Sequence, residues 1–109
     1  MEPSGISVVI PIKNEATKLG QCIEGILNQS VEVEKIVVID SGSTDGSQAI
    51  ARRYSKVQLL EIPAAEFNHG ETRNLGVREC NTEFVVMTVG DARPVSDQWL
   101  SELLKPMAD

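Results

Sequence analysis

Several residue types are scarce in this 109-residue chain, and their scarcity excludes several classes of protein. It has one histidine and two cysteines, so a disulfide scaffold or a zinc site is not expected. Cys22 and Cys80 also lack metal-site or redox spacing, and we expect two buried, reduced thiols. The 10 basic residues are outnumbered by 16 acidic ones. A net charge of −6 argues against nucleic-acid binding, because neutralising phosphates requires a basic face.

No segment has the character of a targeting or membrane-spanning sequence. The first fifteen residues lack a basic region followed by a long apolar run, so they do not resemble a signal peptide. No apolar run approaches the roughly 18–20 residues of a transmembrane helix. These absences predict a cytoplasmic protein. A place at the inner face of the membrane stays open for a full-length protein.

The residues that are abundant indicate one globular domain spanning residues 1–109. The hydrophobic fraction of 41% and the charged fraction of 24% are typical of soluble domains. Apolar, β-branched runs alternate with amphipathic segments, and the helix after residue 70 is expected to place Leu75 on its inner side. Strands are predicted at 6–12, 35–40, 57–62 and 84–88, a loop at 64–70, and helices at 17–28, 46–54, 71–80 and after Ser96.

Buried strands joined by helices predict a mainly parallel α/β sheet. In such sheets ligands bind beyond the carboxyl ends of the strands. The polar, Gly- and Asp-rich turns of this chain all follow strands, and therefore all fall on that edge. They lie at residues 11–15, 40–45, 67–70 and 90–91. The sequence thus predicts a ligand cleft at the carboxyl edge of the sheet.

Four stretches in these turns carry a resemblance to a known family. VIPIKNE at 9–15 and VIDSGSTDG at 38–46 resemble the first two signatures of family 2 glycosyltransferases of the GT-A fold. EFNHGETRNLG at 66–76 resembles the rhamnosyltransferase-like branch, and TVGDARP at 88–94 lies where the family has its metal motif. The resemblance implies a Rossmann-like, three-layer α/β/α fold. It also implies sugar transfer from a nucleoside-diphosphate sugar to a hydroxyl acceptor in glycan, cell-wall or polysaccharide biosynthesis.

The resemblance assigns donor-binding roles to the first two turns. Asp40 is expected to accept hydrogen bonds from the base or ribose of the nucleotide, although it could simply cap the following turn. Pro11 lacks an N–H and is followed closely by Asn14, so the chain can leave the sheet and bend around a base. Ser43 is placed in the same site. Glu15 is a further candidate contact, with a solvated glutamate at a helix start as the alternative.

The metal candidate is Asp91. A divalent cation, Mg²⁺ or Mn²⁺, could neutralise the nucleoside-diphosphate leaving group with only one or two protein carboxylates. The family pattern has a second acidic residue where this chain has Val89. We therefore expect a one-carboxylate variant with weak metal binding in the absence of nucleotide, and a metal-independent mode stays open.

The third turn contributes two more candidates. His69 and Arg73 are four residues apart at the start of a helix and could face the same side. Arg73 could pair with a diphosphate, aided by the helix N-terminus. The alternatives are a surface arginine paired with Glu71 or Glu79, and a histidine that only caps a turn.

Asp45 and Gln48 have the spacing of a capping box, in which the two side chains bond reciprocally to backbone N–H groups at the start of a helix. This role is favoured for Asp45 over direct contact with a ligand. The capping box would place both side chains in the local structure of the second helix.

The resemblance also identifies a missing part. Inverting transfer needs a general base, which the family carries downstream of its metal motif. Asp97 and Glu102 are interpreted as solvated helix residues, so no carboxylate of this chain matches that base, and we expect it beyond Asp109. The chain therefore looks like a truncated donor-binding half that is inactive alone. A homo-oligomer is a further expectation, because an open sheet edge favours self-association.

Two other functions are considered. One is a non-catalytic module that binds a nucleotide or a partner protein. The other is a Rossmann-like nucleotidyltransferase, which would need a Gly-rich, basic loop after the first strand. The PIKNE segment at 11–15 has no glycine and a single lysine, so it disfavours that class.

Overall fold

A four-stranded parallel sheet forms the centre of the protein. The computed structural model describes residues 5–66, 68–90 and 98–101, and only the backbone of Glu66 and His69. The sheet order is β3-β2-β1-β4, and every neighbouring pair is parallel. The strands are β1 (Ile6–Ile12), β2 (Lys35–Asp40), β3 (Val57–Glu61) and β4 (Phe84–Met87).

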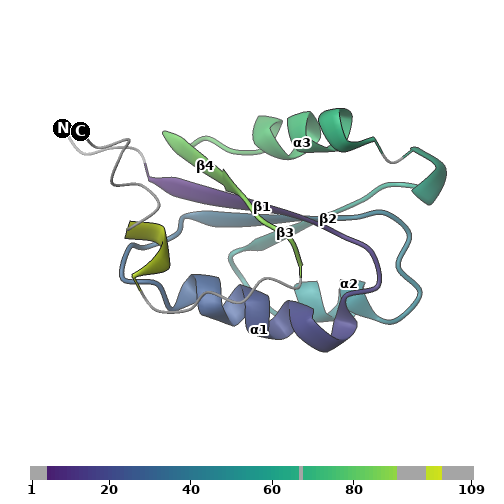
Figure 1. The fold of residues 1–109 in the computed structure, drawn as a ribbon, viewed down its shortest axis with the longest axis horizontal. Coiled ribbons are helices and arrows are strands. Elements are labelled where there is room, and N and C mark those ends of the chain that lie inside the picture. The colour runs from purple at the N-terminus through teal and green to yellow at the C-terminus, as the bar shows by residue number, and fades with distance from the viewer. Residues whose placement is uncertain (1–4, 67, 91–97, 102–109) are drawn as a thin grey trace.

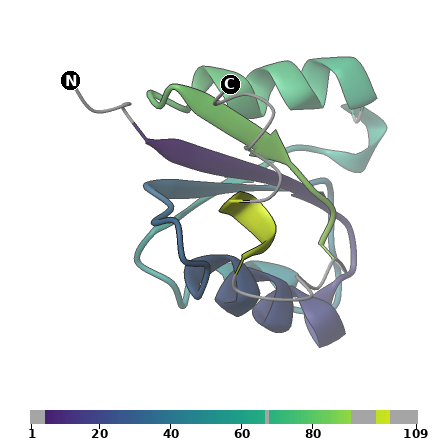
Figure 2. The same ribbon diagram turned by 60° about the vertical axis from the view of Figure 1, so that its left-hand side comes forward.

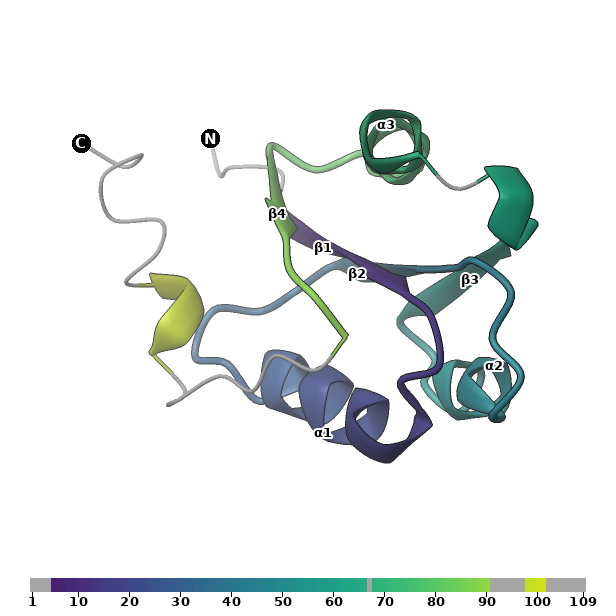
Figure 3. The ribbon, with the colours of Figure 1, turned by 45° about the vertical axis from the view of Figure 1, so that its right-hand side comes forward.

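Helices cover both faces of this sheet. Helices α1 (Ala16–Leu27) and α2 (Ser47–Ala51) lie on one face, and α3 (His69–Arg78) lies on the other (Figure 1). Figure 3 shows the same layers closer to end-on, with the strands between the two helical layers. A short 3-10 helix, η1 (Ala64–Glu66), precedes α3. The predicted three-layer parallel α/β fold is confirmed. Within the described residues, no helix has the length and apolarity needed to cross a membrane.

The central strands are apolar throughout because both of their faces are buried. Alternate side chains point to opposite faces of a sheet. On one face Val8 and Ile10 pack with Leu19 and Ile23 of α1. On the other face Val9 forms a smaller cluster with Val37 and Ile39 of β2. This double burial excludes polar side chains from the middle of β1 and β2, with the exception of Ser7, which is buried and accepts a hydrogen bond from the Thr82 hydroxyl.

Helix α3 packs on the sheet through small residues, and the predicted inner position of Leu75 is met only in part. Leu75 is only half-buried, whereas Gly76 and Thr72 are buried. A Cβ at position 76 would lie 2.5 Å from Val9 Cγ1 and 3.0 Å from Ile39 Cδ1. The helix therefore approaches the sheet too closely for any larger side chain at this position.

The predicted helix ends shift by a few residues, for local reasons. Helix α3 begins at His69 because the Asn68 side chain accepts a hydrogen bond from the Glu71 N–H at 3.1 Å and caps the helix. Helix α2 ends at Ala51, and the chain then closes a tight turn in which the Tyr54 N–H donates to the Ala51 carbonyl. Tyr54 still packs against the core, and its hydroxyl donates to Glu24 on α1.

The last described segment packs beside α1. Residues 99–101 are helical, as predicted, and lie near α1 in Figure 2. Leu100 is fully buried, its N–H donates to Gln29 Oε1 at 2.9 Å, and Trp99 packs on the same core. Both cysteines are reduced thiols, with Cys22 buried and Cys80 half-buried.

The close approach of α3 generates a stability prediction. Gly76→Ala should destabilise the protein by about 1–3 kcal/mol, because the added methyl overpacks the sheet. Gly20→Ala on α1 is the matched control, since its Cβ would meet nothing closer than the Tyr54 hydroxyl oxygen at 3.5 Å. The control should gain roughly 0.5 kcal/mol from helix propensity. Urea unfolding of both variants checks this, and equal effects would contradict the packing argument.

Candidate functional site

The loops that follow β1 and β2 are joined by hydrogen bonds at the carboxyl edge of the sheet. The Asn14 N–H donates to Ser43 Oγ at 2.8 Å, and Asn14 Oδ1 accepts from the Thr44 N–H at 2.8 Å. Asn14 has a φ of 56°, a left-handed conformation that asparagine tolerates better than most residues. Two of the side chains predicted to contact a ligand, Asn14 and Ser43, thus hold the two loops together.

Asp45 caps helices in a way the sequence pattern did not predict. Its Oδ1 accepts from the N–H of Ser47 at 3.1 Å and from the Ser47 hydroxyl at 2.6 Å. Its Oδ2 accepts from the Ala16 N–H at 2.9 Å, at the start of α1. The capping box with Gln48 is wrong, because the Gln48 side chain donates to Asp40 instead. Asp45 therefore links the starts of α1 and α2, two elements far apart in sequence.

These bonds favour the ionised form of Asp45. The Ser47 hydroxyl and the Ala16 N–H hold the pKa of the Asp45 carboxyl below its ordinary value of 3.8. Ser47 Oγ in turn accepts from the Glu15 N–H at 3.0 Å, so the backbone at Glu15 belongs to the same network.

Asp40 ends β2 and is buried with one carboxylate oxygen unpaired. Only 1% of its surface is exposed. Its Oδ2 accepts from the N–H groups of Gly42 at 3.2 Å and Ser43 at 3.1 Å, so Asp40 does cap the following turn. Its Oδ1 has less than 1 Å² exposed and no hydrogen-bond partner among the described residues. A buried polar atom without a partner costs about 1–3 kcal/mol, more when charged, so the carboxylate is incompletely satisfied.

Gln48 is a site residue that sequence reasoning missed. Its Nε2 donates to Asp40 Oδ2 and to the Ser43 carbonyl, both at 2.9 Å. The interpretation of Gln48 as half of a capping box obscured this role. The signal available in the sequence was its position. Gln48 follows Asp40 by eight residues, on the first turn of the next helix, where its side chain can reach back to the end of β2.

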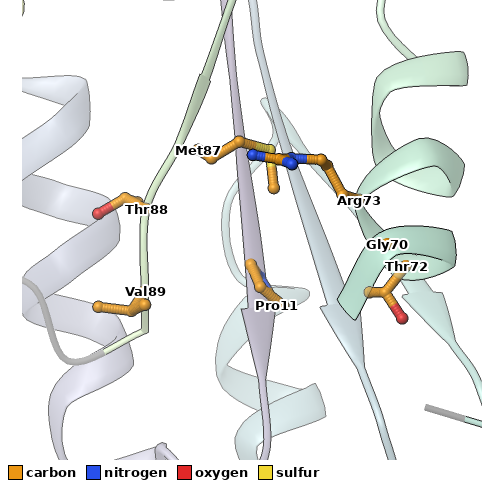
Figure 4. A pocket seen from close by; sticks show the side chains of 7 residues that line it. All are labelled: Pro11, Gly70, Thr72, Arg73, Met87, Thr88 and Val89. Atoms are coloured by element: carbon orange, nitrogen blue, oxygen red, sulfur yellow. The ribbon is translucent and has the colours of Figure 1, made fainter. Parts of the chain in front are cut away.

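A cavity of about 350 Å³ opens between α3 and the carboxyl ends of β1 and β4. Arg73 extends from α3 across β1 toward Met87 (Figure 4). Among the described residues, none accepts a hydrogen bond from the Arg73 guanidinium or forms an ion pair with it. Glu79, one of the two predicted alternative partners, instead accepts a hydrogen bond from Gln58 through its Oε1. The lining residues are Pro11, Gly70, Thr72, Arg73, Met87, Thr88 and Val89. Of these, only Pro11 and Arg73 were predicted as site residues.

The predicted residues lie on both sides of the sheet edge. By the alternation of β1, Pro11 shares the α3 face with Val9, and the cavity lies there. Asp40 shares the opposite face with Val38, and α2 supplies its partner Gln48. A ligand that uses both groups must therefore cross the ends of β1 and β2.

The remaining candidates are described only in part. His69 begins α3, but its side chain lies outside the described residues, as does all of Asp91. Gly90 is buried, and a Cβ there would lie 2.7 Å from Ile12 Cγ2 and 3.0 Å from Glu15 Cγ. The chain after β4 thus returns to the end of β1, so all four predicted turns meet at one edge.

The predictions about a general base concern residues that the structure does not describe. Asp97, Glu102 and Asp109 all lie outside the described residues. The interpretation of Asp97 and Glu102 as solvated helix residues therefore stays a prediction. The same holds for a general base located beyond Asp109 and for the inactivity of the chain on its own.

The described residues contain no cluster of three metal-ligating side chains. In residues 5–66, 68–90 and 98–101 there is no group of three His, Cys, Asp or Glu side chains that could hold a metal ion.

Comparisons with known proteins identify the family. The family model for glycosyl transferase family 2 matches residues 7–109. The chain belongs to glycosyltransferase family 2. Family 2 membership confirms the resemblance carried by the four turns. Curated relatives include glycosyltransferase AglE of Haloferax volcanii, 33% identical over 100 residues, and the O-antigen chain rhamnosyltransferase RfbN of Salmonella typhimurium, 31% identical over 88 residues.

Solved structures support the GT-A fold. The mannosyltransferase PcManGT from Pyrobaculum calidifontis, solved in complex with GDP-Man and Mn²⁺, has a TM-score of 0.86 and 27% identity. This match covers 100% of the present 109-residue chain and 33% of the mannosyltransferase chain. AglE and RfbN are matched over 87% and 80% of this chain, but over 33% and 28% of their own lengths. The chain thus spans about a third of the relatives it matches.

The left-handed conformation of Asn14 gives a test of the loop junction. Asn14→Gly should lower stability by about 1 kcal/mol, because it removes the side-chain bond to Thr44 but accepts a positive φ. Asn14→Ala should cost about 1 kcal/mol more, because alanine resists the left-handed conformation. Thermal unfolding measures both variants. Equal stability of the two would show that the backbone at position 14 is not held there.

The depressed pKa of Asp45 predicts a pH dependence. A lowered folded-state pKa contributes stability that is complete above the unfolded value and is lost as the pH falls through the folded value. Asp45→Asn should therefore be less stable than the wild type at neutral pH, and the difference should shrink as the pH falls from about 5 to about 2. Urea unfolding at a series of pH values tests this. A stability difference between Asp45→Asn and the wild type that stays constant over this pH range would contradict the prediction.

Proposed function

We propose that this chain supplies the donor-binding part of an inverting glycosyltransferase. The complete enzyme would transfer a sugar from a nucleoside-diphosphate sugar to a hydroxyl of a growing glycan, in the cytoplasm or at the inner face of the membrane. One observation carries the proposal. In a family 2 chain, a buried carboxylate oxygen and an arginine guanidinium, both without a partner in the described part of the chain, lie at the same edge of the sheet.

The comparisons support this proposal at the level of ligand class. The mannosyltransferase neighbour was solved with GDP-Man and Mn²⁺, and one relative is named a rhamnosyltransferase. These names favour a nucleoside-diphosphate sugar as donor, and they point to different sugars. The base and the sugar are therefore open to experiment.

The described side chains suit the two ends of such a donor. The Arg73 guanidinium is a fixed positive charge with planar donors that match phosphate oxygens, and it lines the cavity. Asp40 Oδ1 can only accept, so it suits an N–H of the base or a hydroxyl of the ribose. Holding both ends orients the donor for attack by the acceptor hydroxyl. In this proposal the general base that activates the hydroxyl belongs to a part of the enzyme beyond Asp109.

A divalent cation is part of the proposal, with Asp91 as its protein ligand. When bound, the cation would neutralise charge on the departing diphosphate. Mn²⁺ is the ion named for the mannosyltransferase, and Mg²⁺ has the same preference for oxygen ligands.

Calorimetry with UDP, GDP and dTDP, with and without Mn²⁺, tests the function. At least one diphosphate should bind, and more tightly with the cation. Asp40→Asn should weaken its binding by about tenfold or more, because the isosteric amide places a donor where an acceptor is needed. Arg73→Gln should weaken the binding of both the nucleotide and inorganic pyrophosphate.

Arg53→Gln is the control for loss of a positive charge, since Arg53 is exposed on the turn after α2. It should leave binding unchanged. A folded protein that binds none of the three diphosphates would overturn the proposed function and favour a partner-binding module. Equal effects of the Arg53 and Arg73 variants would show that net charge, rather than the cavity, attracts the ligand.

A further inference from the structure

We propose that Gln48 is a positioning residue that holds the Asp40 carboxylate with Oδ1 free for a hydrogen-bond donor of the ligand. This inference rests on the proposed function, because it describes how the binding site for the nucleoside-diphosphate sugar is held ready. Gln48 lies on α2, outside the four turns that form the sheet edge, and does not line the cavity.

The contacts of the Gln48 amide fix its orientation. Nε2 lies 2.9 Å from Asp40 Oδ2 and 2.9 Å from the Ser43 carbonyl oxygen. Both neighbours are acceptors, so only the NH₂ group can face them, and its two N–H donors are both used. The amide therefore connects Asp40 to the turn that follows it.

Gln48 also determines which carboxylate oxygen is left unpaired. With Gln48, three donors converge on Oδ2, from Gly42, Ser43 and Gln48 itself. Without Gln48, a small rotation of the carboxylate could divide the two backbone N–H groups between its two oxygens. That arrangement would satisfy the buried group internally and remove the acceptor offered to a ligand.

This reasoning separates a positioning role from a structural one. A residue that merely stabilised the fold would, when replaced, lower the stability and weaken all ligands together. The loss of Gln48 should instead relieve an unsatisfied oxygen and affect only ligands that reach Asp40. Because Oδ1 has less than 1 Å² exposed, such a ligand must displace a neighbouring side chain as it enters.

The test compares Gln48→Met, which keeps the size but removes both donors, with Gln58→Met. Gln58 is a matched control. It lies on β3, away from the cavity, and its Nε2 also donates to a carboxylate, Glu79 Oε1, at 2.9 Å. Calorimetry should show about tenfold weaker binding of the preferred nucleoside diphosphate to the Gln48 variant, with inorganic pyrophosphate binding unchanged. Its melting temperature should fall no more than that of the control.

Two comparisons make the result specific. In an Asp40→Asn background, Gln48→Met should have no further effect on nucleotide binding, because the acceptor is already lost.

A comparison of UDP with CDP identifies which group of the ligand donates the hydrogen bond to Asp40, since uracil has an N–H where cytosine has a lone pair. If Oδ1 faces the base, Gln48→Met reduces the preference for UDP. If Oδ1 faces the ribose, both ligands weaken equally.

The proposal fails if Gln48→Met weakens nucleotide and pyrophosphate alike, or if its effect adds to that of Asp40→Asn. A ligand-free crystal structure of the Gln48 variant separates this failure from failure of the proposed function. A rotated Asp40 carboxylate supports positioning by Gln48, and an unchanged carboxylate overturns it. Absence of nucleotide binding by the wild type overturns the proposed function alone.

Discussion

The parallel pairing of β1 with β2 is the constraint on which the rest of the structure depends. Its register places Ile12 beside Asp40, so the two strands end at the same level. Both strands are buried on both faces, and unpaired polar groups are costly there. Ligand-binding groups are therefore confined to the places where the strands end. The family's polar motifs follow the strands because the sheet offers no other place for them.

Loop-to-loop hydrogen bonds convert this edge into a defined surface. Asn14, Ser43 and Asp45 would each be credible ligand contacts in isolation, yet their hydrogen bonds connect the loop after β1 to the loop after β2. The network holds the loop after β2 against the loop after β1 and the start of α1. Polar side chains of the two loops thus hold this edge together before any ligand is considered.

Much of this fold follows from the sequence, because its signals are local. The double burial of the strands is visible as uninterrupted Val and Ile runs, and the layers follow from that. The site was harder to predict, because spacing alone does not show which partner a polar side chain selects. Gln48 has the spacing of a capping residue and instead bonds to Asp40 across the turn. Gly76 has no pattern that marks the close approach of α3 to Val9.

The acidic character of the chain is compatible with an anionic ligand once charge is considered locally. The net charge of −6 is distributed over the molecule, whereas a diphosphate responds to the few groups within its reach. In the cavity the charged group is Arg73, and no described carboxylate pairs with it. The Asp40 carboxylate is turned to the other side of the sheet edge, where donors from the turn and α2 bond to it. Separating one cation from one anion across β1 and β2 gives the site a polarity that matches a nucleotide, with phosphates at one end and hydrogen-bond donors at the other.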